Sequence, residues 1–327
     1  MIVIPYKKDL LEEWDDFVIN ESENGTIFHL QKFLSYHPKG RFHDCSVLIK
    51  NKKKKIVAVF PSAIEKKVII SHPGSTYGGI VIKKYLKLQE IEEIYKAIIK
   101  FYSKKGFLEF GLKIIISENF FRSNDKIELF LLNSGMKLLS KEISVVIDVD
   151  DFFQYKGMRR TTKQIIKSDR LQELEHDKFL IATSIEQKKQ AYNLIYNNLK
   201  NKYNKNPTHS FDELMKLEEK FPDSVYFFII ERKMEIVSTY VCFQLNKDVM
   251  HTFYIAKSKN RGTVVDVGLI LYIMEYLKKK NIKFFNFGIS SREKLIKYWI
   301  HNYKEQFSKY LLTRNIWRIK TINMLEV

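Results

Sequence analysis

Three consecutive apolar runs in the second half of the chain place the strongest limit on its fold. VYFFIIE, MEIVSTYVCFQL and VMHTFYIA are rich in β-branched and aromatic residues and are separated by short turns, so they predict three successive antiparallel strands. The elements expected after them are a helix over 265–279, a strand over 283–288, a helix over 294–307 and a strand over 310–319. This order is typical of an α+β layer and not of a doubly wound parallel sheet.

The first half of the chain repeats a similar order of elements. Strands are expected over 46–49, 56–64 and 67–71, and the turn-rich segment HPGSTYGG follows them. A helix is expected over 89–104, because apolar residues recur there with helical spacing, and a strand over 107–116 comes next. The two halves share this outline without obvious sequence similarity, which indicates a structural duplication.

The length of the chain favours two domains. Its 327 residues exceed the size at which one core stays efficient, and we expect domains 1–155 and 156–327, with mixed, antiparallel-rich sheets flanked by helices. The most apolar run, 264–274, is too short to span a bilayer. Cys45 and Cys242 form no CxxC pattern, so neither a disulfide framework nor a zinc site is expected. Together with the lack of a secretory pattern, this predicts a cytoplasmic protein.

The chain is strongly basic. Its 56 Lys and Arg against 38 Asp and Glu give a formal net charge of +18. One interpretation is a polyanionic partner, such as a nucleotide, coenzyme A, tRNA or an anionic lipid surface. The other is compositional, because only ten of these residues are Arg and Lys, Ile, Asn, Phe and Tyr are all abundant. Both interpretations stay open.

A candidate phosphate site lies in the segment IAKSKNRGTVVDVG. A strand is expected to end at Ala256, and a helix is expected to begin after the loop that carries Arg261, Gly262 and Thr263. The first turn of a helix offers free N–H groups and the positive end of a dipole, glycine allows close approach, and arginine adds charge. These residues could therefore hold the phosphates of a donor, although an ordinary helix entry has the same pattern.

The motifs that follow resemble those of a known family. The strand end FNFGIS and the helix KLIKYWIHNYKEQF resemble the closing elements of FemABX-like acyltransferases, which have a GNAT fold. TIFHLQKFL, HPGSTYGGIVI and KGMRRTTKQIIKS also resemble segments of that family. The resemblance implies two tandem GNAT-like domains and transfer of an acyl or aminoacyl group. Two features differ: Ser308 replaces the usual glycine, and the helical arm of the peptidoglycan bridge-forming members is missing.

The resemblance also implies catalytic residues. It places Lys304 at the reacting carbonyl, where an ammonium would stabilise the anionic oxygen of a tetrahedral intermediate. Tyr303 would protonate a departing thiolate. Apart from the resemblance, His251 could accept a proton from the incoming amine, because the ordinary pKa of a histidine suits neutral pH. The alternatives are a surface lysine, a packed tyrosine and a structural histidine in a strand.

Four further residues are candidates for binding the acceptor. Arg159 and Arg160, in the basic segment at the domain junction, could grip phosphates or form salt bridges between domains. Tyr77 in the glycine-rich turn and Tyr254 at the end of a strand could line the pocket. The histidines show no metal-ligand spacing, so we expect no metal.

The sequence thus predicts direct transfer of an acyl group from acyl-CoA to an amine of an amino sugar in a surface-glycan precursor. The acceptor would be linked to a nucleotide or a lipid, and contact with a membrane surface stays open. An alternative is a FemABX-type transferase that uses aminoacyl-tRNA to build a peptidoglycan bridge. A third, from another class, is a non-catalytic nucleic-acid-binding protein, although no such motif is present.

Overall fold

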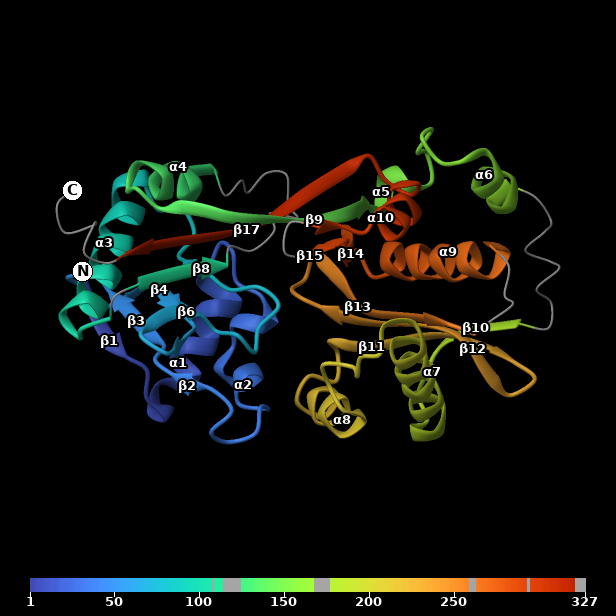
Figure 1. Cartoon of the computed structure of the whole chain (residues 1–327), viewed down its shortest axis with the longest axis horizontal. Helices are drawn as coiled ribbons and strands as arrows, with labels where there is room; N and C mark the ends of the chain where they lie inside the picture. The colour runs from blue at the N-terminus through green and yellow to red at the C-terminus, as the bar shows by residue number, and fades with distance from the viewer. Residues whose placement is uncertain (108, 114–124, 168–176, 259–262, 293–294, 321–327) are drawn as a thin grey trace. The chain divides into compact units, whose positions relative to one another are not determined.

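The computed structural model describes residues 1–107, 109–113, 125–167, 177–258, 263–292 and 295–320 (Figure 1). The chain divides into two compact units. Unit 1 comprises Met1–Ile143, Ser291–Leu295 and Leu312–Val327, and unit 2 comprises Ser144–Ser290 and Ile296–Leu311. These limits follow packing, whereas the predicted domains 1–155 and 156–327 follow the order of elements along the chain and stay a prediction.

Unit 1 is built from mainly antiparallel strands and one long helix. The first sheet has the order β1-β3-β4-β7, formed by β1 (Ile2–Pro5), β3 (Val47–Lys50), β4 (Ile56–Phe60) and β7 (Val81–Ile82). A second group has the order β17-β8-β6-β5-β2, formed by β2 (His43–Asp44), β5 (Ser62–Glu65), β6 (Val68–Ser71), β8 (Glu109–Lys113) and β17 (Tyr310–Lys320). The helices of unit 1 are α1 (Leu11–Asp16), α2 (Gln31–Leu34), α3 (Leu88–Lys104) and α4 (Asp125–Asn133).

The core of unit 1 depends on the apolar stripe of α3. The buried residues of this helix are Ile91, Ile94, Tyr95, Ile98, Ile99 and Tyr102. They recur at the three- and four-residue spacing of one helix face and pack against strand residues such as Phe60 and Phe110. The helix expected over 89–104 is therefore confirmed. It follows β7 and leads to β8, which runs parallel to β6.

Unit 2 is a twisted sheet covered by helices on both faces. Its strand order is β10-β11-β12-β13-β14-β9, formed by the part of β9 (Lys137–Asp148) from Ser144 onward, β10 (Asp177–Ile181), β11 (Val225–Arg232), β12 (Glu235–Gln244), β13 (Val249–Lys257) and β14 (Phe284–Ile289). In Figure 1, α9 (Thr263–Lys279) covers one face of β10–β13 and α7 (Ile185–Tyr203) covers the other. The remaining helices of unit 2 are α5 (Val149–Phe152), α6 (Arg160–Lys167), α8 (Phe211–Lys220) and α10 (Tyr298–Glu305). The short strand β15 (Ser291–Arg292) belongs to unit 1, and β16 (Leu295–Ile296) has one residue in each unit.

The two units repeat one motif. In unit 2, α9 connects β13 to the parallel strand β14, and in unit 1, α3 lies in the connection between the parallel strands β6 and β8, after the short strand β7 of the other sheet. The strands before each helix pair mainly in antiparallel fashion. The predicted α+β fold with mixed, antiparallel-rich sheets is therefore confirmed.

Some elements differ from the sequence prediction. The strand expected over 56–64 is two strands, β4 and β5, because Pro61 between them has no N–H to donate to a ladder. The helix expected over 294–307 begins only at Tyr298, since β16 occupies Leu295–Ile296. Helix α8, with Ser210 as its N-cap, was not predicted.

Candidate functional site

The candidate site lies in unit 2, where two parallel strands separate. β13 and β14 pair over three residue pairs, the last of which is His251 with Asn286. β13 continues along β12 to Lys257, whereas the register of β14 against β9 shifts between Asn286 and Ile289. Among the described residues, no strand pairs with β13 on this side beyond His251. The backbone of β13 therefore presents an edge to which an extended ligand could add hydrogen bonds.

The separation of the strands depends on Gly288. Its φ is +71°, a value that favours glycine, and a Cβ here would lie 3.0 Å from the carbonyl oxygen of Thr252. The buried side chain of Asn286 supports the turn, because its Oδ1 accepts hydrogen bonds from the Gly288 N–H (2.7 Å) and the Ser144 hydroxyl (2.6 Å). The missing side chain thus permits close approach of β13 and β14 just where they part.

Lys304, which belongs to α10, is hydrogen-bonded to the backbone at the end of β14. Its Nζ donates hydrogen bonds to the carbonyl oxygens of Gly288 (2.8 Å) and Ile289 (3.2 Å). Burial lowers the pKa of Lys304 to about 7, while the two carbonyl acceptors favour the charged form. An ammonium has three donors, so two carbonyls leave one N–H for another acceptor. Lys304 is thus a buried amine and not the surface lysine that was the alternative prediction.

Tyr303, the neighbour of Lys304 in α10, points its hydroxyl at another phenol. Its Oη lies 3.0 Å from that of Tyr240 in β12. Burial raises the pKa of both phenols, so both keep their protons at neutral pH. Tyr303 is therefore a proton donor at rest, and its role toward a leaving group stays a prediction.

His251 is brought to the same place as Gly288. It is buried in β13 at the last parallel pair, and a Cβ at position 288 would lie 3.5 Å from its Cε1. His251 and Lys304 therefore both lie next to Gly288: His251 is near its Cα, and Lys304 is hydrogen-bonded to its carbonyl oxygen. Of the predicted catalytic residues, the fold thus brings His251 and Lys304 together around one segment of backbone.

The predicted phosphate loop is only partly described. Arg261 and Gly262 lie outside the described residues, and Thr263 begins α9. One turn later, Asp266 accepts a hydrogen bond from the Lys257 ammonium at the end of β13. Burial raises the pKa of Asp266, and Lys257 opposes this shift. The start of α9 is thereby tied to the strand end that precedes it.

Arg159 and Arg160 lie at the start of α6 and are exposed. The guanidinium of Arg159 donates to the carbonyl oxygen of Asn302 in α10 at 3.1 Å. The basic segment is therefore attached to the helix that carries Lys304. Binding of an acceptor by these arginines stays a prediction.

Tyr254 and Tyr77 are both packed inside their units. Tyr254 is buried in β13, and its Oη lies 3.0 Å from the backbone nitrogen and 3.0 Å from Nδ1 of His209. Burial raises its pKa to about 12. Tyr77 is buried in unit 1, with its ring 5.8 Å from that of Phe28 and 5.9 Å from the guanidinium carbon of Arg314. Their predicted contact with substrate stays untested.

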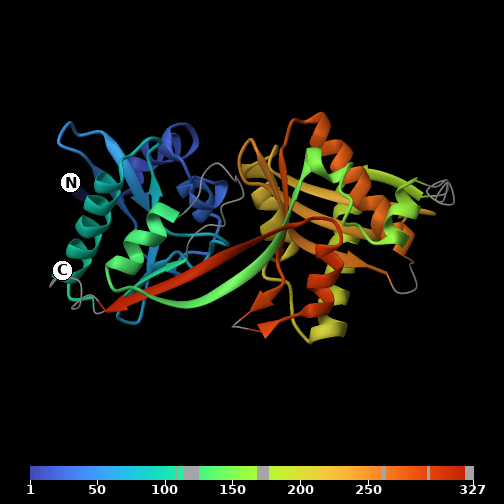
Figure 2. The ribbon, with the colours of Figure 1, turned by 90° about the horizontal axis from the view of Figure 1, so that it is seen from above.

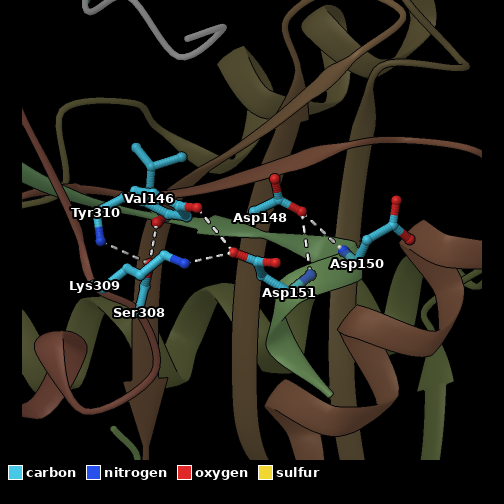
Figure 3. Close-up of polar contacts among 7 residues, drawn as sticks. All are labelled: Val146, Asp148, Asp150, Asp151, Ser308, Lys309 and Tyr310. Carbon is cyan, nitrogen blue, oxygen red and sulfur yellow. Dashed lines mark hydrogen bonds and ion pairs between the residues drawn. The ribbon is translucent and has the colours of Figure 1, made fainter. Parts of the chain in front are cut away.

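A polar cluster joins the end of α10 to β9 (Figure 3). The hydroxyl of Ser308 donates to the carbonyl oxygen of Val146. Asp151 accepts from the Tyr310 hydroxyl at 2.8 Å and lies 3.0 Å from the Lys309 ammonium. Ser308, which replaces the glycine of the family pattern, thus has a bonding role here and helps to position α10.

Three residues that shape the site were not predicted: Ser144, Tyr240 and Asn286. Each acts through a partner on another strand or helix, so only the pairing of the sheet brings them together. Gly288 is visible in the strand-end motif FNFGIS, but its contact with Thr252 depends on the fold.

Within the described residues, no group of three or more His, Cys, Asp or Glu side chains is arranged to hold a metal ion. No helix in the described part of the chain has the length and apolar character needed to cross a bilayer.

Comparisons with known proteins locate the fold. No protein-family model and no curated protein sequence matches the chain. FemX superimposes with a TM-score of 0.70 at 10% identity, over 97% of this chain and 97% of FemX. The C-terminal domain of an Agrobacterium fabrum protein described as a lysylphosphatidylglycerol synthetase gives 0.59 at 10% identity, over 97% and 94%. A tandem GNAT protein from the clavulanic acid biosynthesis pathway gives 0.53 at 9% identity, over 98% of each.

Because the sequence identities are so low, the similarity to these structures concerns the fold alone. It extends over nearly the whole length of FemX and of the tandem GNAT protein, and so includes both units. The motifs FNFGIS and KYWIHNYKEQF lie where β14 and α10 form the candidate site. The chain thus has the two-domain FemABX/GNAT-like fold that its motifs predict.

Proposed function

We propose that this chain is an acyl- or aminoacyltransferase that transfers its group directly from a donor to an amine. The observation that carries this proposal is the buried amine of Lys304 beside the open edge of β13. An apolar side chain could occupy the position without the cost of burying an amine. A lysine with a pKa near neutral, next to a backbone edge that can take an extended ligand, is typical of a reactive site.

The reaction needs few groups. The amine nitrogen attacks the donor carbonyl, a C–N bond forms, and the bond from that carbon to sulfur or oxygen breaks. The remaining N–H of Lys304 can donate to the oxyanion, and His251 can accept the proton that the amine loses. Tyr303 can give its proton to the leaving group. Proximity supplies the rest of the rate.

For the donor and acceptor, we favour acyl-CoA and an amino sugar of a nucleotide- or lipid-linked surface-glycan precursor. The basic loop before α9 and the net charge of +18 suit a polyanionic donor. The missing helical arm separates the chain from the longer peptidoglycan bridge-forming members, as the motif comparison indicates.

One observation favours aminoacyl-tRNA as an alternative donor. FemX and the lysylphosphatidylglycerol synthetase domain superimpose better, with TM-scores of 0.70 and 0.59, than the tandem GNAT protein does at 0.53. Both donors are polyanions, so the charge of the chain does not distinguish them.

A donor screen separates these alternatives. The purified chain is incubated with acetyl-CoA, longer acyl-CoAs or charged tRNA, each with amino-sugar and peptidoglycan-precursor acceptors, and products are identified by mass spectrometry. Binding of tRNA without any product would favour a non-catalytic nucleic-acid-binding protein instead.

With the active pair, Lys304→Ala should lower kcat by roughly 10²–10³-fold, because one oxyanion donor is lost. The KM for donor should change much less. The matched control is Lys309→Ala, which removes an exposed lysine of the same chain segment. A folded Lys304→Ala protein with the turnover of Lys309→Ala would remove Lys304 from the mechanism.

A further inference from the structure

Large apolar side chains are exposed at the start of α10 and in the short strand before it. Leu295 exposes 74% of its surface, Tyr298 66%, Trp299 62% and Ile296 40%. The opposite face of α10 is buried and carries Lys304. Four large apolar residues within five positions of the chain are thus exposed, and exposed apolar residues that lie close together are a candidate surface for interaction. We call Leu295, Ile296, Tyr298 and Trp299 the apolar patch; Figure 2 shows the hairpin and helix that carry it in orange and red.

The surroundings of the apolar patch are basic. Lys297 lies within it, and its ammonium lies 4.8 Å from the ring of Tyr203 at the end of α7. The exposed residues Lys200, Lys202 and Lys205 belong to the same end of α7. The sequence contains no Asp or Glu over 187–211 or over 294–304. The acids that flank the second stretch are Glu293, which lies outside the described residues, and Glu305, which lies 3.8 Å from His301.

We propose that the apolar patch and its flanking lysines dock this protein on an anionic bilayer. Tryptophan and tyrosine prefer the boundary between headgroups and acyl chains, and lysines attract anionic headgroups. The exposed Leu295 and Ile296 favour a bilayer over RNA as the partner. Aliphatic side chains are stabilised by transfer from water into hydrocarbon, whereas a phosphate backbone offers them no such stabilisation. The mixture of aliphatic, aromatic and basic groups is that of an interfacial membrane contact.

Docking would place α10 against the membrane surface. Trp299 and Lys304 lie five residues apart in one helix, on its exposed and buried faces. The candidate site would then lie next to lipid-linked acceptors. This consequence rests on the proposed transferase function, whereas the docking itself does not.

The test uses the intrinsic fluorescence of the full chain without donor or acceptor. The chain has three tryptophans, of which Trp14 and Trp317 expose 0% and 2% and Trp299 exposes 62%. Its emission therefore reports mainly changes around Trp299. Vesicles of phosphatidylglycerol with phosphatidylcholine should shift the emission to the blue and protect it from acrylamide, and pure phosphatidylcholine vesicles should do neither.

Variants assign the contact to the apolar patch. Tyr298→Asn combined with Trp299→Ala should weaken sedimentation with anionic vesicles by about tenfold or more, since two inserted aromatic groups are lost. The control Tyr85→Asn removes a tyrosine that is 94% exposed in unit 1 and should bind as the wild type does.

A second pair of variants tests the charge. Lys202→Gln with Lys205→Gln should weaken vesicle binding, whereas Lys52→Gln with Lys53→Gln, in an exposed turn of unit 1, should not.

Three results would overturn the proposal. One is vesicle binding that the aromatic variants leave unchanged. Another is protection of Trp299 by tRNA with no effect of vesicles, which would assign the surface to RNA. The third is a concentration-dependent blue shift without lipid, which would assign it to a second copy of the chain. A chain that docks but transfers nothing would contradict the proposed function alone.

Discussion

Replacing Lys304 by methionine should change how the stability of the protein depends on pH. Methionine keeps the length of the side chain and removes the amine. In the folded protein, burial lowers the pKa of Lys304 from 10.5 to about 7. The unfolded chain has the ordinary value, so between these two pH values the unfolded state binds the extra proton and the folded state does not.

This difference in proton binding sets the direction in which stability changes with pH. Stability rises with pH wherever the unfolded state holds more protons, so the wild type should gain stability relative to Lys304→Met as pH rises from about 7 toward 10.5. The pKa difference between 10.5 and about 7 corresponds to a gain in the free energy of unfolding of at most about 5 kcal/mol, at about 1.36 kcal/mol per pH unit. Up to pH 9.5, below the range where most tyrosines titrate, roughly 3 kcal/mol of this gain is accessible. The carbonyls of Gly288 and Ile289 favour the ammonium and reduce the gain.

The assay is urea unfolding followed by circular dichroism at several pH values between about 7 and 9.5. Contributions of all other groups cancel in the difference between wild type and variant. Lys309→Met is the control: Asp151 raises the pKa of Lys309 above its usual value, so its contribution is constant below the unfolded pKa and the difference should stay flat. A flat difference for Lys304→Met as well would show that Lys304 stays charged, and would refute the argument from burial.

Two further predictions concern packing, and both are measured by urea unfolding. Gly288→Ala should destabilise the protein by about 1–2 kcal/mol more than Gly135→Ala. Both glycines have a left-handed φ, but of the two only position 288 faces a backbone oxygen, that of Thr252. Equal losses of stability would contradict this steric explanation. Glu142→Gln should cost about 3 kcal/mol, because it leaves the buried guanidinium of Arg314 without its counter-ion. Replacing both Glu142 and Arg314 by methionine should restore most of that loss, and a cost of less than about 1 kcal/mol for Glu142→Gln would show that the pair is dispensable.

The sequence predicted best the elements whose pattern is local. The apolar stripe of α3 follows from spacing alone, because a helix repeats its faces within four residues. The three antiparallel strands of unit 2 follow from their composition and short turns. The break at Pro61 was missed although a proline within a strand pattern signals an interruption, and the structure shows β4 and β5 in different sheets. Helix α8 was missed although Ser210 and Glu213 form a capping box, a signal that is present in the sequence.

The candidate site was less predictable, because its contacts join residues far apart in the chain. The family motif pointed to Lys304, yet the spacing could not show that its amine is buried against the carbonyl of Gly288. Whether His251 lies near that glycine depends on the register between β13 and β14. The ion pair of Glu142 and Arg314 joins positions 172 residues apart, and no local pattern predicts it.

The duplicated motif explains why the chemistry is expected in unit 2 and not in unit 1. In unit 1, the parallel pairing of β6 and β8 ends at Ile70 and Gly111, and β6 itself ends at the next residue. Within the described residues β6 therefore has no comparable edge, and α4, the next helix described after β8, turns apolar side chains such as Phe130 and Leu131 into the core. In unit 2, β13 continues from His251 to Lys257 beyond the last parallel pair, and the corresponding helix buries an amine. A longer strand and a buried lysine are therefore the two features of unit 2 on which the proposed transferase function rests.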